Sequence, residues 1–323
     1  MQRLGAMLHD CAFQPEGTQE VRPLYDAPWR GDSGPEFDAQ PPIIQGLGCE
    51  WPCVPFGRSG EQLVLPSEWK TGDTQPWDDW AHGYASNNDW DIEQLDATTL
   101  KASIDYPVDT PILRLEREVR LQADRPGLFI SLEIHARRET SFPLGLHPVL
   151  SMVGAAPGEL QLVVPGSTRV WSFPVDVEPG RNHFSPNQQD LPLNGLKDVT
   201  DKLADPRFLP PPGQSEDLLL LSGTGGSVGL INPVQGCITT VHWDSGQIPG
   251  CLLWISNGGR DYYPWNSRVA ALGIEPVVAN FDLGMAHSVS SDNPIAQRGI
   301  PTTISVGPDR PFKCAYRIEI DAV

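Results

Sequence analysis

The sequence predicts an all-β protein, built as one large antiparallel β-sandwich. The clearest signal is the alternation of apolar and polar side chains along residues 113–121 and again along residues 128–136. Residues 124–127, Asp-Arg-Pro-Gly, form a turn signal between these runs, so we expect a β-hairpin with one buried face. Helical periodicity is scarce, and only residues 196–208 are predicted to hold a short helix. Many strands with almost no helix favour a large antiparallel sandwich.

Further short strands are expected along the chain, nearly all bounded by turn residues. They are residues 160–164, 170–173, 218–222, 227–232, 238–243, 252–255 and 316–320. Up to about residue 45 the chain is polar and rich in Gly, Pro and Asp, so residues 1–45 are predicted to wrap the domain irregularly. The Pro-rich residues 173–215 are expected to form a surface excursion. Because no linker or composition shift divides the chain, residues 1–323 are predicted to form a single domain.

Composition limits the classes of partner. The formal charge of −18 opposes binding to nucleic acid, because phosphate contacts need clustered Lys and Arg. No apolar run approaches the length of a membrane span, and the N-terminus lacks the pattern of a signal peptide. We therefore expect a cytoplasmic protein with no membrane partner, as a monomer or homodimer. The six cysteines argue against a disulfide scaffold, and Cys49 and Cys53 lack a second Cys or His pair at zinc-finger spacing, so no metal site is predicted.

The candidate catalytic residues are one glutamate and two histidines, each in an apolar setting bounded by turn residues. Glu275 lies in Leu-Gly-Ile-Glu-Pro, which predicts a short buried strand that ends at Pro276 and points a carboxylate into a pocket. His82 lies in Ala-His-Gly-Tyr, and His147 lies in Leu-His-Pro. A glutamate and two histidines can form an acid–base set that works near neutral pH.

Aromatic and amide side chains near His82 are typical of a polyol site, because rings stack on sugar C–H faces and amides bond hydroxyls. The candidate binding residues are Arg58, Trp51, Tyr84 and Trp90. A glycine-bounded loop is expected to present Glu50 together with Trp51 and Arg58. The alternative for each ring is a place in the core, and an isolated arginine is more often solvated or ion-paired. Residues 71–100 contain seven acidic residues and no Lys or Arg, so this segment is very negative.

The order of these motifs resembles the aldose 1-epimerase (galactose mutarotase-like) superfamily. The matching blocks are Pro-Phe-Gly-Arg at 55–58, His-Gly-Tyr-Ala at 82–85, His-Pro at 147–148 and Gly-Ile-Glu-Pro at 273–276. The resemblance implies the supersandwich fold, with Glu275 as catalytic base, His147 as general acid and His82 as the other active-site histidine. Arg58 matches the substrate-binding arginine. Ser86 stands where sugar-phosphate-directed relatives commonly carry an arginine, and His147 lacks the aromatic that many relatives carry after the following proline.

The resemblance predicts an isomerase that interconverts the α and β anomers of a sugar by ring opening. The acidic residues of segment 71–100, together with Ser86, favour a neutral sugar over a sugar phosphate. One base and one acid suffice for this chemistry, so no cofactor is expected. A partly desolvated glutamate has a raised pKa, and a histidine close to carboxylates is expected to stay protonated. Two alternatives remain open. One is a non-catalytic carbohydrate-binding protein of the same fold, and the other is a different carbohydrate-active enzyme, a hydrolase or lyase.

Overall fold

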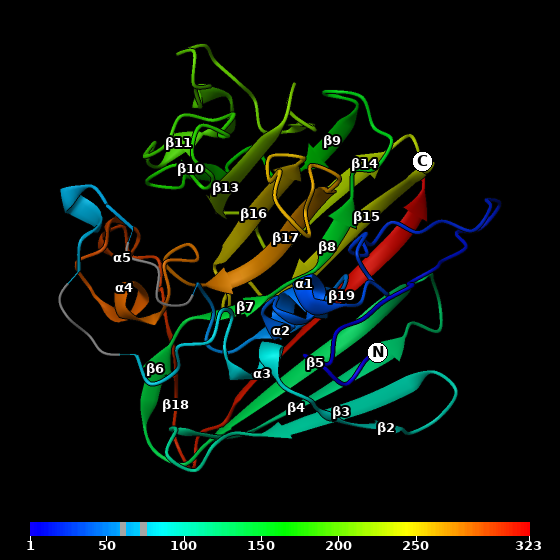
Figure 1. The fold of residues 1–323 in the computed structure, drawn as a ribbon, viewed down its shortest axis with the longest axis vertical. Helices are drawn as coiled ribbons and strands as arrows, with labels where there is room; N and C mark the ends of the chain where they lie inside the picture. The colour runs from blue at the N-terminus through cyan, green and yellow to red at the C-terminus, as the bar shows by residue number, and fades with distance from the viewer. Residues whose placement is uncertain (59–62, 72–75) are drawn as a thin grey trace.

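A computed structural model describes residues 1–58, 63–71 and 76–323, and two large antiparallel sheets dominate it (Figure 1). In the described residues, the first sheet has the order β1-β7-β17-β16-β13-β10-β11, and β8 also pairs with β17. Its strands are β1 (Pro52–Cys53), β7 (Leu144–Leu146), β8 (Val149–Ser151), β10 (Arg169–Ser172), β11 (Leu191–Pro192), β13 (Ser215–Ser222), β16 (Gly250–Asn257) and β17 (Ala270–Val278).

The second sheet has the order β12-β9-β14-β15-β19-β5-β4-β3-β2. Its strands are β2 (Asp91–Gln94), β3 (Thr99–Asp105), β4 (Ile112–Leu121), β5 (Gly127–Ala136), β9 (Leu160–Val163), β12 (Phe208–Leu209), β14 (Ser227–Asn232), β15 (Cys237–Trp243) and β19 (Phe312–Ala322). A small ribbon pairs β6 (Thr140–Phe142) with β18 (Ile304–Val306). The helices are α1 (Pro35–Asp38), α2 (Pro42–Gln45), α3 (Tyr84–Asn87), α4 (Met285–Val289) and α5 (Pro294–Gln297), with 3-10 turns η1 (Ser67–Trp69) and η2 (Leu193–Gly195).

The predicted all-β antiparallel sandwich is confirmed. The predicted hairpin is β4 and β5, in a register that places Leu115 opposite Ile134 and Val119 opposite Ile130. Every second side chain along β5 from Leu128 onward is buried, as the alternation in the sequence requires. The seven further predicted strands are present as β9, β10, β13, β14, β15, β16 and β19, with their ends moved by a few residues.

The helix predicted for residues 196–208 is wrong. The Asp198 carboxylate accepts the N–H groups of Thr200 and Lys202 at 2.7 and 3.1 Å, which fixes a turn instead. Leu203 is 72% exposed, so the segment buries no continuous apolar face. Because short helices in proteins depend on packing of such a face, the local pattern could not form one here.

Apolar side chains form two layers, one on each face of the first sheet. Successive side chains of β16 alternate between them, with Leu253 between the two sheets and Leu252 and Trp254 on the outer face. The N-terminal part of the chain covers this outer face with residues such as Trp29 and Ile43, and α1 and α2 lie over it in Figure 1. The outer face is therefore an enclosed layer and not a solvated sheet surface.

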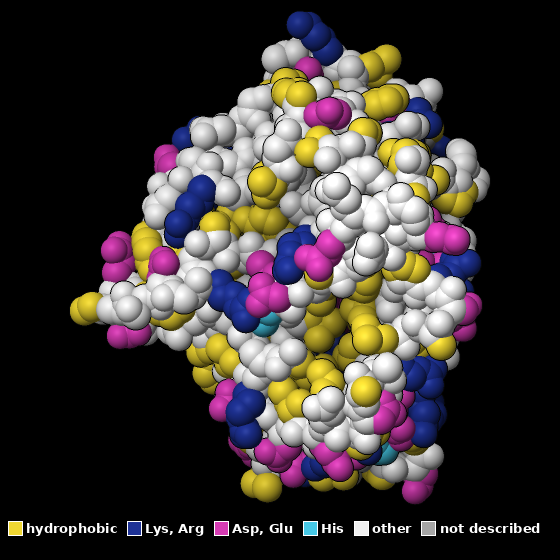
Figure 2. Space-filling model, turned by 90° about the vertical axis from the view of Figure 1, so that its right-hand side faces the viewer, with side chains coloured by type: hydrophobic (Ala, Val, Ile, Leu, Met, Phe, Trp, Pro, Cys, Tyr) yellow, Lys and Arg dark blue, Asp and Glu magenta, His cyan; other side chains and the backbone are white. Residues whose placement is uncertain are grey.

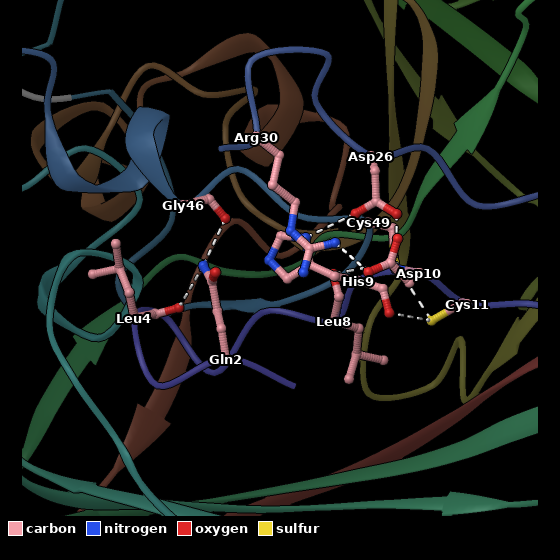
Figure 3. A network of polar contacts seen from close by, with 10 residues as sticks. All are labelled: Gln2, Leu4, Leu8, His9, Asp10, Cys11, Asp26, Arg30, Gly46 and Cys49. Atoms are coloured by element: carbon pink, nitrogen blue, oxygen red, sulfur yellow. Dashed lines mark hydrogen bonds and ion pairs between the residues drawn. The ribbon is translucent and has the colours of Figure 1, made fainter. Parts of the chain in front are cut away.

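Polar contacts hold the N-terminal segment in place (Figure 3). His9 Nδ1 lies 2.7 Å from Asp26 Oδ1, and Arg30 forms an ion pair with Asp10. The Sγ atoms of Cys11 and Cys49 lie 3.6 Å apart. Residues 8 and 50 form a β-bridge, which joins the segment to the chain just before β1.

The surface carries charges of both signs. On the face drawn in Figure 2, acidic and basic side chains are mixed around an apolar hollow. Part of the acidic segment 71–100, residues 72–75 with Asp73, lies outside the described residues. Among the helices of the described residues, none is long and apolar enough to cross a membrane.

Candidate active site

The register of the first sheet places three predicted site residues in one row. β17 pairs in one register with both β7 and β8, the two strands that flank His147. Continued across the gap between them, this register places His147 opposite Glu275. On the other side, β1 pairs with β7 so that Pro52 faces Leu146, which places Trp51 opposite His147. Residues opposite one another share a face of the sheet, so the row Trp51, His147 and Glu275 lies on one face.

Two prolines interrupt the sheet ladder at this row. Ile274 donates its N–H to Pro148 O at 3.0 Å, and the next N–H on that side would belong to Pro276, which has none. Pro148 also has no N–H, so it cannot donate a hydrogen bond to the carbonyl oxygen of Ile274. His147 and Glu275 thus form a pair without ladder hydrogen bonds, the kind in which opposite side chains come closest. The prediction that Pro276 ends the strand is wrong, because β17 continues to Val278 and holds Glu275 inside it.

Contacts on both sides fix the His147 ring. Its Nε2 lies 3.3 Å from Glu275 Oε1. The imidazole stacks on the Trp51 indole with 3.9 Å between ring centroids and 16° between planes, and the His147 N–H donates to Trp51 O at 2.9 Å. Trp254 of β16 meets the imidazole edge-on at 6.1 Å. Only 1% of Glu275 and 5% of His147 is exposed, so the pair is shielded from water.

His82 reaches the same place from a separate turn. Its ring meets that of His147 edge-on at 5.5 Å and lies 5.0 Å from the Phe56 ring. The His82 backbone is left-handed, with φ of 56°, and its N–H donates to Gly57 O at 2.6 Å. Such a backbone is strained for a non-glycine residue, and strain of this kind concentrates at functional sites. The structure thus brings the three residues predicted as catalytic together.

Arg58 lies beside this row and pairs with Asp282, a residue that the sequence did not assign. Arg58 Nη2 and Nε lie 2.8 and 3.2 Å from Asp282 Oδ2, and the Arg58 N–H donates to Asp282 O at 2.8 Å. The guanidinium lies 5.1 Å from the Phe173 ring centroid. Asp282 follows β17 in an ordinary-looking loop, so its sequence signal was weak.

A second arginine, Arg260, approaches the outer face from the loop after β16. Its Nε lies 2.9 Å from Glu178 Oε1 and 3.8 Å from Glu216 Oε2, and its guanidinium lies 4.4 Å from the Trp265 ring centroid. Glu216 of β13 also accepts the Trp254 indole N–H at 3.3 Å. Glu178, Glu216 and Trp265 had not been assigned to the site, since only the folded chain brings them together.

The structure does not bring Tyr84, Trp90 or Glu50 to this row. Trp90 is fully buried in the layer between the sheets and donates its indole N–H to Ala85 O at 2.8 Å, so its place is the core. Tyr84 packs with its ring 5.0 Å from that of Tyr106. Glu50, expected to be presented by a loop, is 0% exposed.

Comparison with known proteins identifies structures that share the fold of this chain. No protein-family model and no curated protein matches the chain. The solved Slr1438 protein of Synechocystis sp. PCC 6803 matches with a TM-score of 0.62 and 14% identity over 100% of this chain and 91% of that chain. The GalM/aldose epimerase homologue of C. elegans matches with 0.59 and 15% over 99% and 94%. A galactose mutarotase related enzyme of Lactobacillus acidophilus matches with 0.52 and 15% over 84% and 83%. The chain has the galactose mutarotase-like fold.

Within this galactose mutarotase-like fold, burial shifts the pKa values of Glu275, His147 and His82. Burial raises the pKa of Glu275 well above its usual range, and the Asp282 charge raises it further. Burial lowers the pKa of His147 well below its usual value of 6.5, with a further contribution from His82. Burial also lowers the pKa of His82 to about 4. The expectation that His147 stays protonated is therefore corrected, because burial disfavours the charged forms of both His147 and Glu275.

The candidate site contains buried polar atoms without hydrogen-bond partners among the described residues. They are both carboxyl oxygens of Glu275, Nδ1 of His147, Nδ1 of His82, Nε1 of Trp51 and Oδ1 of Asp282. Nearly all buried polar atoms in folded proteins have a partner, so this concentration at one place indicates a site for a polar ligand. No group of three or more His, Cys, Asp or Glu side chains able to hold a metal ion occurs in the described ranges.

Proposed function

We propose that the protein is an isomerase of the aldose 1-epimerase type, which interconverts the α and β anomers of a neutral sugar. The observation that carries this proposal is the buried contact of 3.3 Å between Glu275 and His147, with unpartnered polar atoms around it. Opening a cyclic hemiacetal requires one proton to be removed and another to be donated. Two adjacent acid–base groups with unpartnered polar atoms around them are suited to this exchange.

In the proposed mechanism, a bound sugar activates the pair. Its hydroxyls offer hydrogen bonds to the charged forms, which offsets their desolvation and lets the proton move from Glu275 to His147. The Glu275 carboxylate then takes the proton of the anomeric hydroxyl, O1 forms a double bond to C1, and the C1–O5 bond breaks. O5 takes the proton of His147. After rotation about C1–C2 the same steps run in reverse, and each group regains its starting proton.

Two aromatic neighbours support these roles. The Trp51 indole lies flat against His147, where a π-face favours a positive charge and so assists protonation of the imidazole. His82 stays neutral at physiological pH because its pKa lies at about 4. We therefore assign His82 a hydrogen bond to a sugar oxygen and not a proton transfer.

The charges around the site favour a neutral sugar over a sugar phosphate. Arg58 is paired with Asp282, and Arg260 is paired with Glu178. Ser86, at the position where phosphate-directed relatives commonly carry an arginine, is fully buried and donates its hydroxyl hydrogen to His82 O at 2.7 Å. A phosphate dianion would therefore compete with carboxylates for both arginines.

Glu275→Gln tests the proposal, because the amide keeps the shape of the side chain but cannot accept the proton. Freshly dissolved α-anomers of several aldoses are followed by polarimetry, and the variant should lose about 10²- to 10⁴-fold of the catalysed rate. Glu93→Gln, at an exposed position of β2, is the matched control and should keep it. Near-normal turnover by a folded Glu275→Gln protein would exclude Glu275 as the base. Sugar binding without acceleration by the unmodified protein would instead identify a carbohydrate-binding protein.

A further inference from the structure

Gly273 occupies the position on β17 two residues before Glu275, so both residues face the same side of the sheet. A Cβ atom built on Gly273 would lie 2.2 Å from Glu275 Oε1 and 3.1 Å from Glu275 Cδ. The Glu275 carboxyl therefore turns back over Gly273. It occupies space that any side chain at residue 273 would fill.

The oxygen that lies over Gly273 is the same one that faces His147. Glu275 Oε1 is 3.3 Å from His147 Nε2 and is also the atom closest to the hydrogen face of Gly273. We propose that Gly273 is a positioning residue, whose missing side chain lets the Glu275 carboxyl reach His147. This inference rests on the proposed function only where activity is measured.

Two considerations support this role over a purely structural one. The backbone of Gly273 is not in the left-handed region, so no turn requires glycine there. Glycine inside a strand weakens it, because it has no side chain to pack and loses more conformational freedom on folding. Space for a neighbour is the remaining reason for a glycine at this place. Trp254 Cβ, 3.1 Å from the same built Cβ, is the other neighbour that would have to move.

An added methyl group would displace the carboxyl oxygen by about 1 Å, since ordinary contacts begin near 3.4 Å and the built distance is 2.2 Å. A misplacement of about 1 Å in an active site can cost on the order of 10²-fold in rate. Gly273→Ala should therefore lower kcat by about this factor and change KM much less. Gly166→Ala is the matched control, because a Cβ there meets nothing within 4 Å. It should leave both constants unchanged.

The ¹⁵N NMR signal of His147 Nε2 gives a readout that needs no activity. Gly273→Ala should shift this signal in the otherwise unmodified protein, because the carboxyl moves away from it. In a Glu275→Ala background the same glycine substitution should leave the signal unchanged, since no carboxyl remains to be displaced.

The two readouts keep the inference and the proposed function apart. An unmodified protein without epimerase activity would overturn the proposed function, while the NMR comparison would still decide the role of Gly273. An unchanged Nε2 signal in Gly273→Ala would overturn the inference. So would an equal shift in the Glu275→Ala background, which would point to Trp254 as the neighbour that responds.

Discussion

The substitution Glu50→Gln should destabilise the protein strongly, although Glu50 lies outside the regular strands. Glu50 is fully buried and lies 2.5 Å from Arg117 Nη2, while the Tyr316 hydroxyl donates to its other oxygen. The amide keeps the shape and one acceptor but removes the charge. Arg117, with a side chain only 1% exposed, would then keep an uncompensated positive charge between the sheets. Breaking one partner of a buried ion pair costs about 3–5 kcal/mol in free energy of unfolding.

This free energy converts into a measurable temperature. Unfolding entropy is about 2.1 cal/mol/K per residue, so a chain of 323 residues gains roughly 0.7 kcal/mol/K. A loss of 3–5 kcal/mol should therefore lower Tm by about 4–7 °C. Chemical denaturation followed by circular dichroism would measure the free energy directly.

Two comparisons make the assay decisive. Glu139→Gln breaks an exposed pair with Arg310, 2.8 Å apart with side chains 70% and 63% exposed, and should cost less than about 1 kcal/mol. Adding Arg117→Met to Glu50→Gln removes the uncompensated charge and should restore part of the lost stability. Equal losses for Glu50→Gln and Glu139→Gln, or no recovery in the double variant, would refute the reasoning.

Three further predictions follow from other parts of the molecule. Glucose 6-phosphate should be turned over with a lower kcat/KM than glucose, and a higher value in competition assays would contradict the paired arginines. Burial raises the pKa of Asp217 to about 7, so the folded state should lose stability as pH rises from about 4 to 7. Asp217→Asn should flatten that slope, and equal slopes would exclude Asp217 as its origin. A peroxide should oxidise the Cys11 and Cys49 thiols, 3.6 Å apart, to one disulfide while it is reduced to water. That disulfide should add about 4 kcal/mol to stability, a gain that Cys11→Ser should abolish.

Local patterns predicted the strands well and the boundaries less well. The alternation along β4 and β5 is a property of neighbouring residues, and the sheet preserves it. The segment 196–208 failed because side-chain hydrogen bonds from Asp198 favour a turn, which an apolar pattern does not show. The predicted strand end at Pro276 was wrong for another reason: a proline is tolerated within a strand at a position where no ladder hydrogen bond is needed.

The candidate site was predicted only where its residues have a local sequence signal. Glu275, His147 and His82 carry recognisable local settings, and the fold brings them together. Asp282 and its pairing with Arg58 depend on contacts between distant segments, which one sequence does not display. The pKa of His147 was expected to be raised by nearby carboxylates, but burial and the neighbouring His82 lower it, and burial is a property of the whole fold.

The two prolines beside His147 and Glu275 have a consequence for how this protein can change. Because His147 and Glu275 face each other across neighbouring strands, their spacing is set by the geometry of a β-sheet, while Arg58, Arg260 and His82 come from loops. Loops tolerate substitution and insertion better than paired strands. Under the proposed function, changes in these loops would alter sugar preference while the distance between His147 and Glu275 stays constant. The proposed function would then place the chemistry on paired strands and the selectivity on loops, two parts of the chain that can vary separately.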